Sequence, residues 1–337
     1  MRAVLYVDKE TGTTVGEVAD PSPGPADVIV AVEACGLCGS DVHAVQNGNC
    51  APGQILGHEF SGRIAALGSD VSGWREGQAV AASPIGSCGE CRICARGLPF
   101  RCPAEENIGI TIPGAYAQYV KVPARQLVAL PPDLPLELGS HAEPLSVARQ
   151  AVKLARVGPG DPVLVYGVGP IGLYAIMALK LAGAGPVVAA GRSAGRRQAA
   201  ADVGADSVID TREISVAEYA KQSGTLFAAA LECSAAPGAF NEALSVTEPG
   251  GTVVEVALTP EQPPLPLFGI LSDGQHIVGA CAFSDETYRE SVRHLAAGRV
   301  PVDRLVSERV SLDDTPDALR RLQTPGTLVR IISRPGG

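Results

Sequence analysis

The sequence predicts an α/β protein in which a β-rich region is joined to a doubly wound parallel sheet. Three observations support this fold class. Short apolar runs separated by Gly and Pro fill the first 140 residues, strands and helices alternate from about residue 160 to 280, and a glycine-rich turn opens that alternation. A chain of 337 residues is long enough for two domains, each with its own core.

The N-terminal region has the pattern of an irregular β domain. Its apolar runs are short and are bounded by turn-forming residues, as expected of strands in such a domain. The expected strands cover residues 28–32, 62–67, 79–82, 117–122 and 127–130. At Ser146–Ala155 the apolar residues take a helical spacing, which predicts a helix there.

The region that follows alternates between strands and helices of a length typical of parallel α/β sheets. Strands are expected at 162–166, 187–190, 207–209, 227–232, 251–257 and 276–280, with helices at 171–182, 195–203 and 239–246. The C-terminal part predicts a helix at 286–297 and a final strand at 328–333. We expect this tail to return to the first domain.

Composition and charge exclude several classes of function. The chain is 46% hydrophobic and 19% charged, with a formal net charge of -9, which is unfavourable for binding nucleic acid or an anionic membrane surface. The first residues, MRAVLYVDKE, lack the pattern of a secretory signal, and no apolar stretch is long enough to span a bilayer. We therefore expect a cytoplasmic protein. Nine cysteines, seven of them between residues 35 and 102, favour metal binding over a disulfide framework there.

The glycine-rich turn predicts a dinucleotide site. Gly167, Gly169 and Gly172 have G-x-G-x-x-G spacing, with Pro170 and Ile171 opening the helix. The first glycine permits a tight turn, the second lets the backbone approach a pyrophosphate, and the third lets helix and strand pack closely. Such turns also occur without a ligand; the surrounding strands and helices favour the functional interpretation.

The next strand ends in Gly191, Arg192 and Ser193, where an NAD-binding chain carries an acidic residue. Glycine leaves room for a 2′-phosphate, and Arg192 and Ser193 supply donors for its oxygens, with Arg196 and Arg197 as further donors. This pattern predicts NADP(H). The alternative is an exposed, arginine-rich helix start without a ligand.

Two groups of residues predict metal sites. Cys88, Cys91, Cys94 and Cys102 form C-x2-C-x2-C-x7-C, a set of four thiolates that closes a structural zinc site. An iron–sulfur cluster is the alternative, and the last spacing argues against it. Elsewhere, a cysteine, a histidine and carboxylates make the open three-ligand set of a catalytic zinc: Cys38, His58, Glu59 and Glu143. Taken singly, these are ordinary buried or surface residues, and Cys35 with Cys38 is also a C-x2-C pair of the redox type.

With these motifs in hand, the chain resembles the zinc-dependent medium-chain dehydrogenases/reductases, in the branch of sorbitol, butanediol and threonine dehydrogenases. The segments that carry the resemblance are GLCGSDVH, GHEFSG, the four-cysteine lobe, EPLSVA and GVGPIG. The resemblance implies a GroES-like catalytic domain at 1–146 and 282–337, with the zinc lobe at about 86–103. It implies a Rossmann domain at 147–281 and a homodimer or homotetramer.

The resemblance also implies roles for single residues. Cys38 and His58 would bind the catalytic zinc, with either Glu143 or Glu59 as the further ligand, so that the chain holds two zinc ions. Ser40 and His43 match the family's proton relay, through which a small-molecule alcohol loses its proton before hydride passes to NADP. The reverse reaction reduces the ketone.

Two departures from the branch narrow the choice of cofactor and of substrate. The absence of an acidic residue at Gly191 argues against NAD, and Ile85 stands where threonine dehydrogenases carry a histidine. We therefore expect a secondary alcohol or polyol rather than threonine. The same chemistry with NAD, or a non-catalytic NADPH-binding sensor of this fold, remain as alternatives. Cys35, Cys50, Cys233 and Cys281 are expected to be small buried apolar residues.

Overall fold

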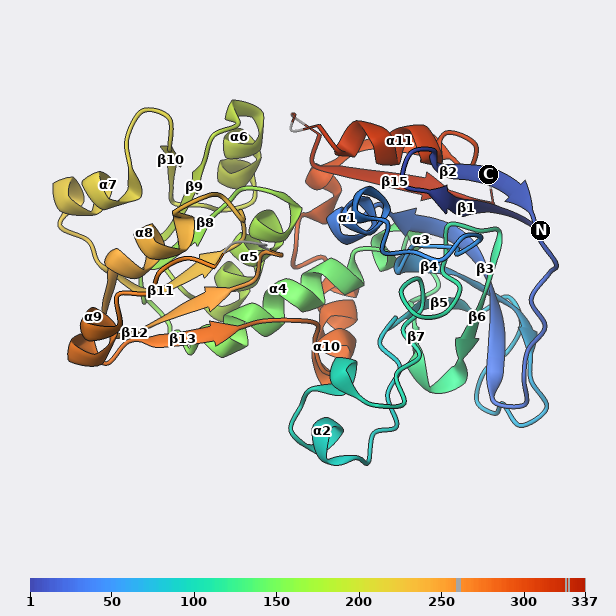
Figure 1. Ribbon diagram of the computed structural model, residues 1–337. Helices are drawn as coiled ribbons and strands as arrows, with labels where there is room; N and C mark the ends of the chain where they lie inside the picture. The colour runs from blue at the N-terminus through green and yellow to red at the C-terminus, as the bar shows by residue number, and fades with distance from the viewer. Residues whose placement is uncertain (259–261, 325, 327, 337) are drawn as a thin grey trace. The chain divides into compact units, whose positions relative to one another are not determined.

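The computed structural model describes residues 1–258, 262–324, 326 and 328–336, and the chain forms two compact units (Figure 1). The first unit comprises Met1–Glu143 and Phe283–Gly337, and the second comprises Pro144–Ala282. The sequence placed these boundaries at 146/147 and 281/282. The first unit is thus built from the two ends of the chain, and the second is inserted between them.

The first unit is organised around a seven-stranded sheet. Six strands follow the order β14-β15-β3-β4-β5-β7, and β6 pairs with the long strand β3. The C-terminal strand β15 lies antiparallel to β3, with Ile332 opposite Gly36 and Ser333 opposite Cys35. The tail of the chain therefore completes the sheet that the N-terminal residues begin.

The first unit consists mostly of strands, with helices of one to three turns between some of them. Before the second unit they are β1 (Arg2–Asp8), β2 (Gly12–Glu17), β3 (Asp27–Gly36), α1 (Gly39–Asn47), β4 (Glu59–Leu67), β5 (Ala79–Ala82), α2 (Arg92–Ala95), β6 (Tyr119–Pro123), β7 (Leu127–Ala129) and α3 (Leu136–Gly139). After it they are α10 (Asp285–Ala296), β14 (Val306–Ser311), α11 (Thr315–Leu322) and β15 (Arg330–Arg334). The 3₁₀ turns are η1 (Pro99–Arg101), η2 (Ala124–Gln126) and η3 (Val302–Leu305).

The second unit contains a six-stranded parallel sheet in the order β10-β9-β8-β11-β12-β13. Its strands are β8 (Val163–Tyr166), β9 (Val187–Gly191), β10 (Ser207–Asp210), β11 (Phe227–Glu232), β12 (Thr247–Glu255) and β13 (His276–Gly279). Its helices are α4 (Ala142–Ala155), which begins at the end of the first unit, α5 (Pro170–Ala182), α6 (Ala194–Asp202), α7 (Val216–Ser223), α8 (Ala239–Ser245) and α9 (Leu267–Asp273). This sheet confirms the predicted α/β class.

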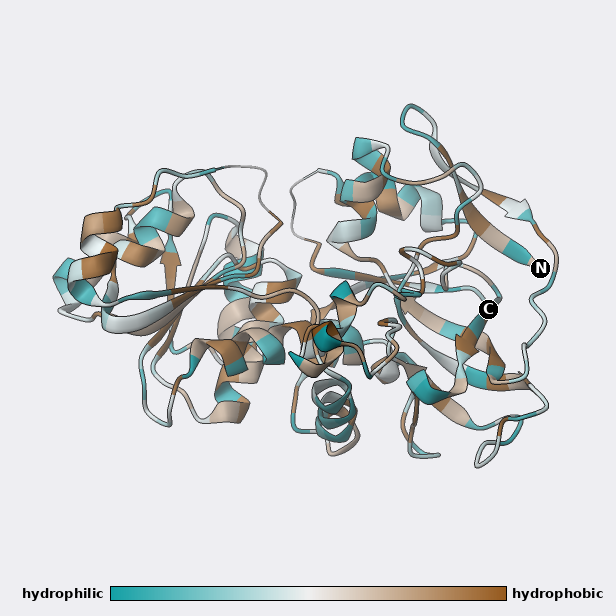
Figure 2. Cartoon of the chain, turned by 60° about the horizontal axis from the view of Figure 1, so that its bottom comes forward, coloured by the Kyte–Doolittle hydropathy of each residue, from teal (hydrophilic) through white to brown (hydrophobic). Residues whose placement is uncertain are grey.

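The central strands β8 and β9 are buried along their whole length, because helices cover both faces of the sheet. Helix α5 packs on β8 and β9, whereas α8 packs on β8, β11 and β12. In Figure 2 the helices of this unit carry both brown and teal bands, as expected of helices with one face on a sheet and one in solvent. The strand order reverses between β8 and β11, and the carboxyl ends of strands at such a switch point are where ligands bind in open α/β sheets.

The cysteines outside the predicted metal sites do not share one environment. Cys35 is buried in the core of the first unit, and the half-buried Cys50 packs against the same core. Cys233 is half-buried, but Cys281 is exposed, so the expectation that all four are buried is wrong for Cys281. None of the helices in the described ranges combines the length and apolarity needed to cross a bilayer.

Candidate functional site

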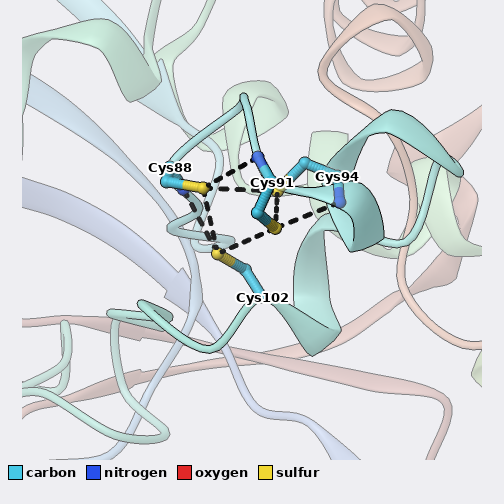
Figure 3. Close-up of side chains that lie close together, drawn as sticks. All are labelled: Cys88, Cys91, Cys94 and Cys102. Carbon is cyan, nitrogen blue, oxygen red and sulfur yellow. Dashed lines mark hydrogen bonds between the residues drawn. The ribbon is translucent and has the colours of Figure 1, made fainter.

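The four predicted lobe cysteines meet around a common point (Figure 3). Neighbouring Sγ atoms lie 3.5 Å apart for Cys91–Cys94 and Cys88–Cys102, and 4.0 Å apart for Cys88–Cys94 and Cys91–Cys102. A zinc ion with Zn–S bonds of about 2.3 Å requires an S···S edge of roughly 3.8 Å in a regular tetrahedron. The sulfurs are therefore spaced for a single tetrahedral ion, and they are too far apart for disulfides.

The backbone of the lobe favours thiolates. Cys91 N–H donates to Cys88 Sγ at 3.3 Å, Cys94 N–H donates to Cys91 Sγ at 3.4 Å, and Cys88 N–H donates to Cys102 Sγ at 3.4 Å. Hydrogen bonds from the backbone N–H groups of Glu90 and Cys91 lower the pKa of the Cys88 thiol to about 6, whereas desolvation and a hydrogen bond with Cys91 raise the pKa of the Cys94 thiol to about 11. The lobe residues thus fit a structural zinc ion in geometry, and three of their sulfur contacts come from backbone N–H groups that stabilise thiolates.

A second metal-binding group lies in the first unit. One ligand atom each from Cys38, His58 and Glu59 falls within 4.8 Å of the others. Cys38 precedes α1, whereas His58 and Glu59 stand at the start of β4, whose residue Glu59 is opposite Gly36 on β3. A thiolate, an imidazole and a carboxylate are the ligand types of a catalytic zinc site.

Contacts around His58 orient its ring toward Cys38. Ser40 Oγ lies 3.4 Å from His58 Nε2, and Asp41 Oδ1 lies 3.4 Å from the other ring nitrogen, Nδ1. Asp41 is itself held by the phenol of Tyr116, which donates to Asp41 Oδ2 at 2.6 Å. Burial opposes a charge on His58, but Asp41 and Cys38 outweigh it and raise the His58 pKa well above its ordinary value. Asp41 therefore lies behind the His58 ring as a counter-charge, although the 3.4 Å contact is not a hydrogen bond to Nδ1.

Glu59 has a strong partner of its own. Arg330 Nη1 lies 2.5 Å from Glu59 Oε2, and both side chains are 2% exposed. Arg330 Nη2 also donates to the carbonyl oxygen of Ser140 at 2.9 Å. Gly36 makes this pair possible, because a Cβ at that position would overlap both Arg330 and Glu59. The carboxylate is thus held beside Cys38 and His58 by a cation from the C-terminal strand.

The structure answers in part the choice between Glu59 and Glu143. Glu59 belongs to the compact group with Cys38 and His58, whereas Glu143 is not part of it. Glu143 is buried at the start of α4, and burial raises its pKa to about 8, while His58 opposes and Glu59 reinforces that shift. The geometry therefore favours Glu59 as the nearer carboxylate.

The two residues of the expected proton relay lie on one helix. Ser40 and His43 are three positions apart on α1 and so share a face. Ser40 is half-buried, and its hydroxyl donates to Cys38 Sγ at 3.2 Å, whereas His43 is exposed. The helix thus carries one hydroxyl at the metal-binding group and one titratable side chain at the surface.

The glycine-rich loop has the geometry that the sequence predicts. Gly167 has φ +107, a conformation that favours glycine, and a Cβ on Gly172 would lie 1.8 Å from the carbonyl oxygen of Gly167. Gly169, which precedes Pro170 and Ile171 at the start of α5, faces open space where the others face protein. The space at Gly169 beside free N–H groups of a helix start suits a pyrophosphate.

The loop after β9 is cationic, and Gly191 at its start is packed against Val168. A Cβ on Gly191 would lie 2.3 Å from Val168 Cγ2, so an acidic side chain there requires Val168 to move. Arg192 is exposed, and Ser193 is the N-cap residue of α6 without a side-chain cap hydrogen bond. Arg196 is half-buried on α6. These residues lie together at the carboxyl end of β9, where the adenosine ribose binds in dinucleotide folds.

Comparisons with known proteins agree with this geometry. Residues 24–132 match the alcohol dehydrogenase GroES-like domain, and residues 170–297 match the zinc-binding dehydrogenase domain. The L-threonine 3-dehydrogenase of Stenotrophomonas maltophilia is 32% identical over 323 residues, covering 93% of this chain and 94% of that protein. The chain belongs to the zinc-type medium-chain dehydrogenase/reductase family.

Two further relatives support the assignment of the chain to this family. The sorbitol dehydrogenase of Bacillus subtilis is 32% identical over 320 residues, covering 92% of this chain and 90% of its own. A zinc-binding dehydrogenase structure from Sinorhizobium meliloti, bound to NADP, has a TM-score of 0.92 and 31% identity, with 99% of each chain covered. The family resemblance inferred from the motifs is thus confirmed. The family is one of alcohol and polyol dehydrogenases.

Three residues that contact the metal-binding group or its neighbours were given no role by the sequence analysis: Asp41, Tyr116 and Arg330. Asp41 lies within the GLCGSDVH motif, so its position beside the ligands was a usable signal. Arg330 contacts Glu59 across 271 residues of sequence, and Tyr116 contacts Asp41 across 75. No local pattern connects residues at such separations.

Proposed function

We propose that the chain is a zinc- and NADP(H)-dependent dehydrogenase that interconverts a secondary alcohol or polyol and the corresponding ketone. The observation that carries this proposal is the group of Cys38, His58 and Glu59 with the Ser40 hydroxyl against it. A structural site has four protein ligands, whereas this group has three and a proton-carrying side chain beside it.

In this proposal, the bound zinc supplies a Lewis acid for the substrate oxygen and the bound nicotinamide accepts or donates hydride. Cys38, His58 and Glu59 hold the metal, and Asp41 keeps the His58 ring oriented. The Ser40 hydroxyl accepts the proton of the alcohol as it gives up its own, and His43, one turn along α1 and exposed, delivers a proton to solvent at the outer end of the relay. The lobe cysteines hold a second zinc ion that maintains the fold of residues 88–102.

The dinucleotide is held by the second unit. Gly167, Gly169 and Gly172 with the start of α5 receive the pyrophosphate. Gly191, Arg192, Ser193 and Arg196 receive the 2′-phosphate, because they offer cations and a hydroxyl where an acidic side chain is absent. The NADP bound to the Sinorhizobium meliloti relative supports this preference.

The substrate class is proposed from one position of the sequence. Ile85 stands where threonine dehydrogenases carry a histidine, and its side chain is apolar and buried. For this reason we propose a secondary alcohol or polyol rather than threonine, although the chain is similar to threonine dehydrogenases.

We also propose that the protein is a homo-oligomer that pairs through β13. This strand is at one edge of the six-stranded sheet, and its residues are largely exposed. The preceding helix α9 exposes Leu267, Phe268 and Leu271 at 70%, 82% and 78%. An open strand edge beside exposed apolar side chains favours pairing with a second copy of the chain.

The test is a panel of polyols, secondary alcohols and ketones, with NADP(H) and NAD(H) in parallel, followed by the absorbance of the reduced nicotinamide. The proposal expects turnover with NADP(H) and loss of turnover in Cys38→Ala. Preference for NAD(H) would refute the cofactor assignment. Tight NADPH binding with the lobe zinc alone would instead identify a non-catalytic sensor.

A further inference from the structure

The acidic residue that is absent from the end of β9 has a counterpart on the neighbouring strand. β9 and β10 pair in parallel, and Asp210 at the end of β10 lies opposite Gly191. Hydrogen bonds from Arg212 hold the pKa of Asp210 far below its ordinary value, so its carboxylate is charged at neutral pH. An unmasked carboxylate at this level would repel a 2′-phosphate and would accept a hydrogen bond from a ribose 2′-hydroxyl.

Arg197 of α6 masks this carboxylate from the protein side. Its Nη2 lies 2.7 Å from Asp210 Oδ2, with 15% of the Arg197 side chain and 9% of the Asp210 side chain exposed. Its Nη1 donates to the carbonyl oxygens of Gly191 at 3.2 Å and of Arg192 at 2.7 Å. One guanidinium therefore joins the end of β10 to the two residues at which the phosphate loop begins.

Arg212 holds the same carboxylate from the solvent side. Its Nε and Nη2 lie 3.0 Å and 2.6 Å from the two oxygens of Asp210, and 58% of its side chain is exposed. Within the described residues, the Arg212 guanidinium hydrogen-bonds Asp210, and it has no such bond to Gly191 or Arg192. Arg212 and Arg197 thus both pair with the Asp210 carboxylate, but of the two it is Arg197 that also hydrogen-bonds the carbonyl oxygens of Gly191 and Arg192.

We propose that Arg197 is a positioning residue that sets the preference of the loop after β9 for a 2′-phosphate. It does so by fixing the backbone of Gly191 and Arg192 and by cancelling the charge of Asp210. This inference rests on the proposed NADP(H) dependence and concerns the same loop. With Arg197 in place, the side chains of Arg192 and Ser193 are free to donate hydrogen bonds to the 2′-phosphate, and the charge of Asp210 is neutralised by its pairing with Arg197. Without it, the loop loses two hydrogen bonds and Asp210 regains a partly unopposed charge.

The experiment measures binding of 2′,5′-ADP and 5′-AMP by calorimetry, so that neither zinc nor an alcohol substrate is needed. The variants are Arg197→Met, Arg197→Lys, Arg212→Met and the double variant Arg197→Met/Asp210→Asn, each checked for an unchanged circular dichroism spectrum. We expect Arg197→Met to weaken 2′,5′-ADP by about tenfold or more and 5′-AMP by less than about threefold. Arg197→Lys, which keeps the charge but not the fork of donors, should fall between Arg197→Met and the unchanged protein.

The controls separate the two parts of the role. Arg212→Met should lose clearly less affinity for 2′,5′-ADP than Arg197→Met, because the loop carbonyls keep their donor. The double variant should regain part of the affinity that Arg197→Met loses, because the repelling carboxylate is gone. Equal losses in Arg212→Met and Arg197→Met would overturn the positioning role, and no recovery in the double variant would overturn the charge role.

The same data distinguish this inference from the proposed function. If the unchanged protein prefers 5′-AMP, the NADP(H) assignment itself fails. If it prefers 2′,5′-ADP but Arg197→Met loses both nucleotides equally, or neither, then the inference fails while the cofactor assignment stands.

Discussion

The buried pair of Arg330 and Glu59 gives the largest stability effect that we predict from the structure. Arg330→Met removes a guanidinium that lies 2.5 Å from Glu59 and leaves the carboxylate 2% exposed. Removing one partner of a buried ion pair costs about 3–5 kcal/mol, because the remaining charge has lost both water and counter-charge. For a domain of roughly 150–250 residues, each kcal/mol lowers the melting temperature by about 2–4 °C. The expected fall is therefore roughly 6–20 °C.

The assay is thermal unfolding, followed by circular dichroism, of protein freed of metal with a chelator, so that no zinc ion acts as a second counter-charge to Glu59. Arg309→Met is the matched control, since Arg309 pairs with Glu137 at the surface with 48% of its side chain exposed. A surface pair of this kind is worth about 0–1 kcal/mol, so the control should melt close to the unchanged protein. Replacing both partners, as Arg330→Met/Glu59→Leu, should recover much of the loss. An Arg330→Met protein that melts with the Arg309→Met control would refute the argument.

Three further predictions concern the site and the assembly. Ser40→Ala should lower turnover by about a hundredfold or more with zinc content unchanged, and normal turnover would remove Ser40 from the relay. Tyr116→Phe removes the 2.6 Å hydrogen bond to Asp41 and should weaken zinc at Cys38 and His58 by about tenfold in a chelator competition. The lobe zinc is the internal reference for that measurement, and equal weakening of both ions would point to a general loss of structure. Phe268→Asp should lower the mass measured by light scattering to that of a monomer, whereas an unchanged mass would exclude α9 from the interface.

Sequence patterns predicted the second unit well because its signals are local. Buried parallel strands are continuous apolar runs, and the glycine spacing before α5 has one structural meaning in that context. The expected strand at 227–232 matches β11, and most other strand and helix ends in this unit differ from the structure by one to four residues.

The first unit was harder to predict because its order depends on distant pairing. Helix α1, which carries Ser40 and His43, has Cys38 as an N-cap without a side-chain cap hydrogen bond, so no start signal marks it. The strands β1, β2 and β14 and the helices α2, α3 and α11 were also missed. The ligand residues were found because their motifs are local, but the Arg330–Glu59 pair spans 271 residues and has no local signature.

The lobe and the group at Cys38 are each proposed to bind one zinc ion, and the zinc content per chain counts both. The spacing of the lobe sulfurs fits a closed zinc site, and the group of Cys38, His58 and Glu59 fits an open one. The zinc content per chain, measured by mass spectrometry on the unchanged protein and on Cys38→Ala, tests this account most directly. It predicts two zinc ions in the unchanged protein and one in the variant. A single ion that is unaffected by Cys38→Ala would contradict it.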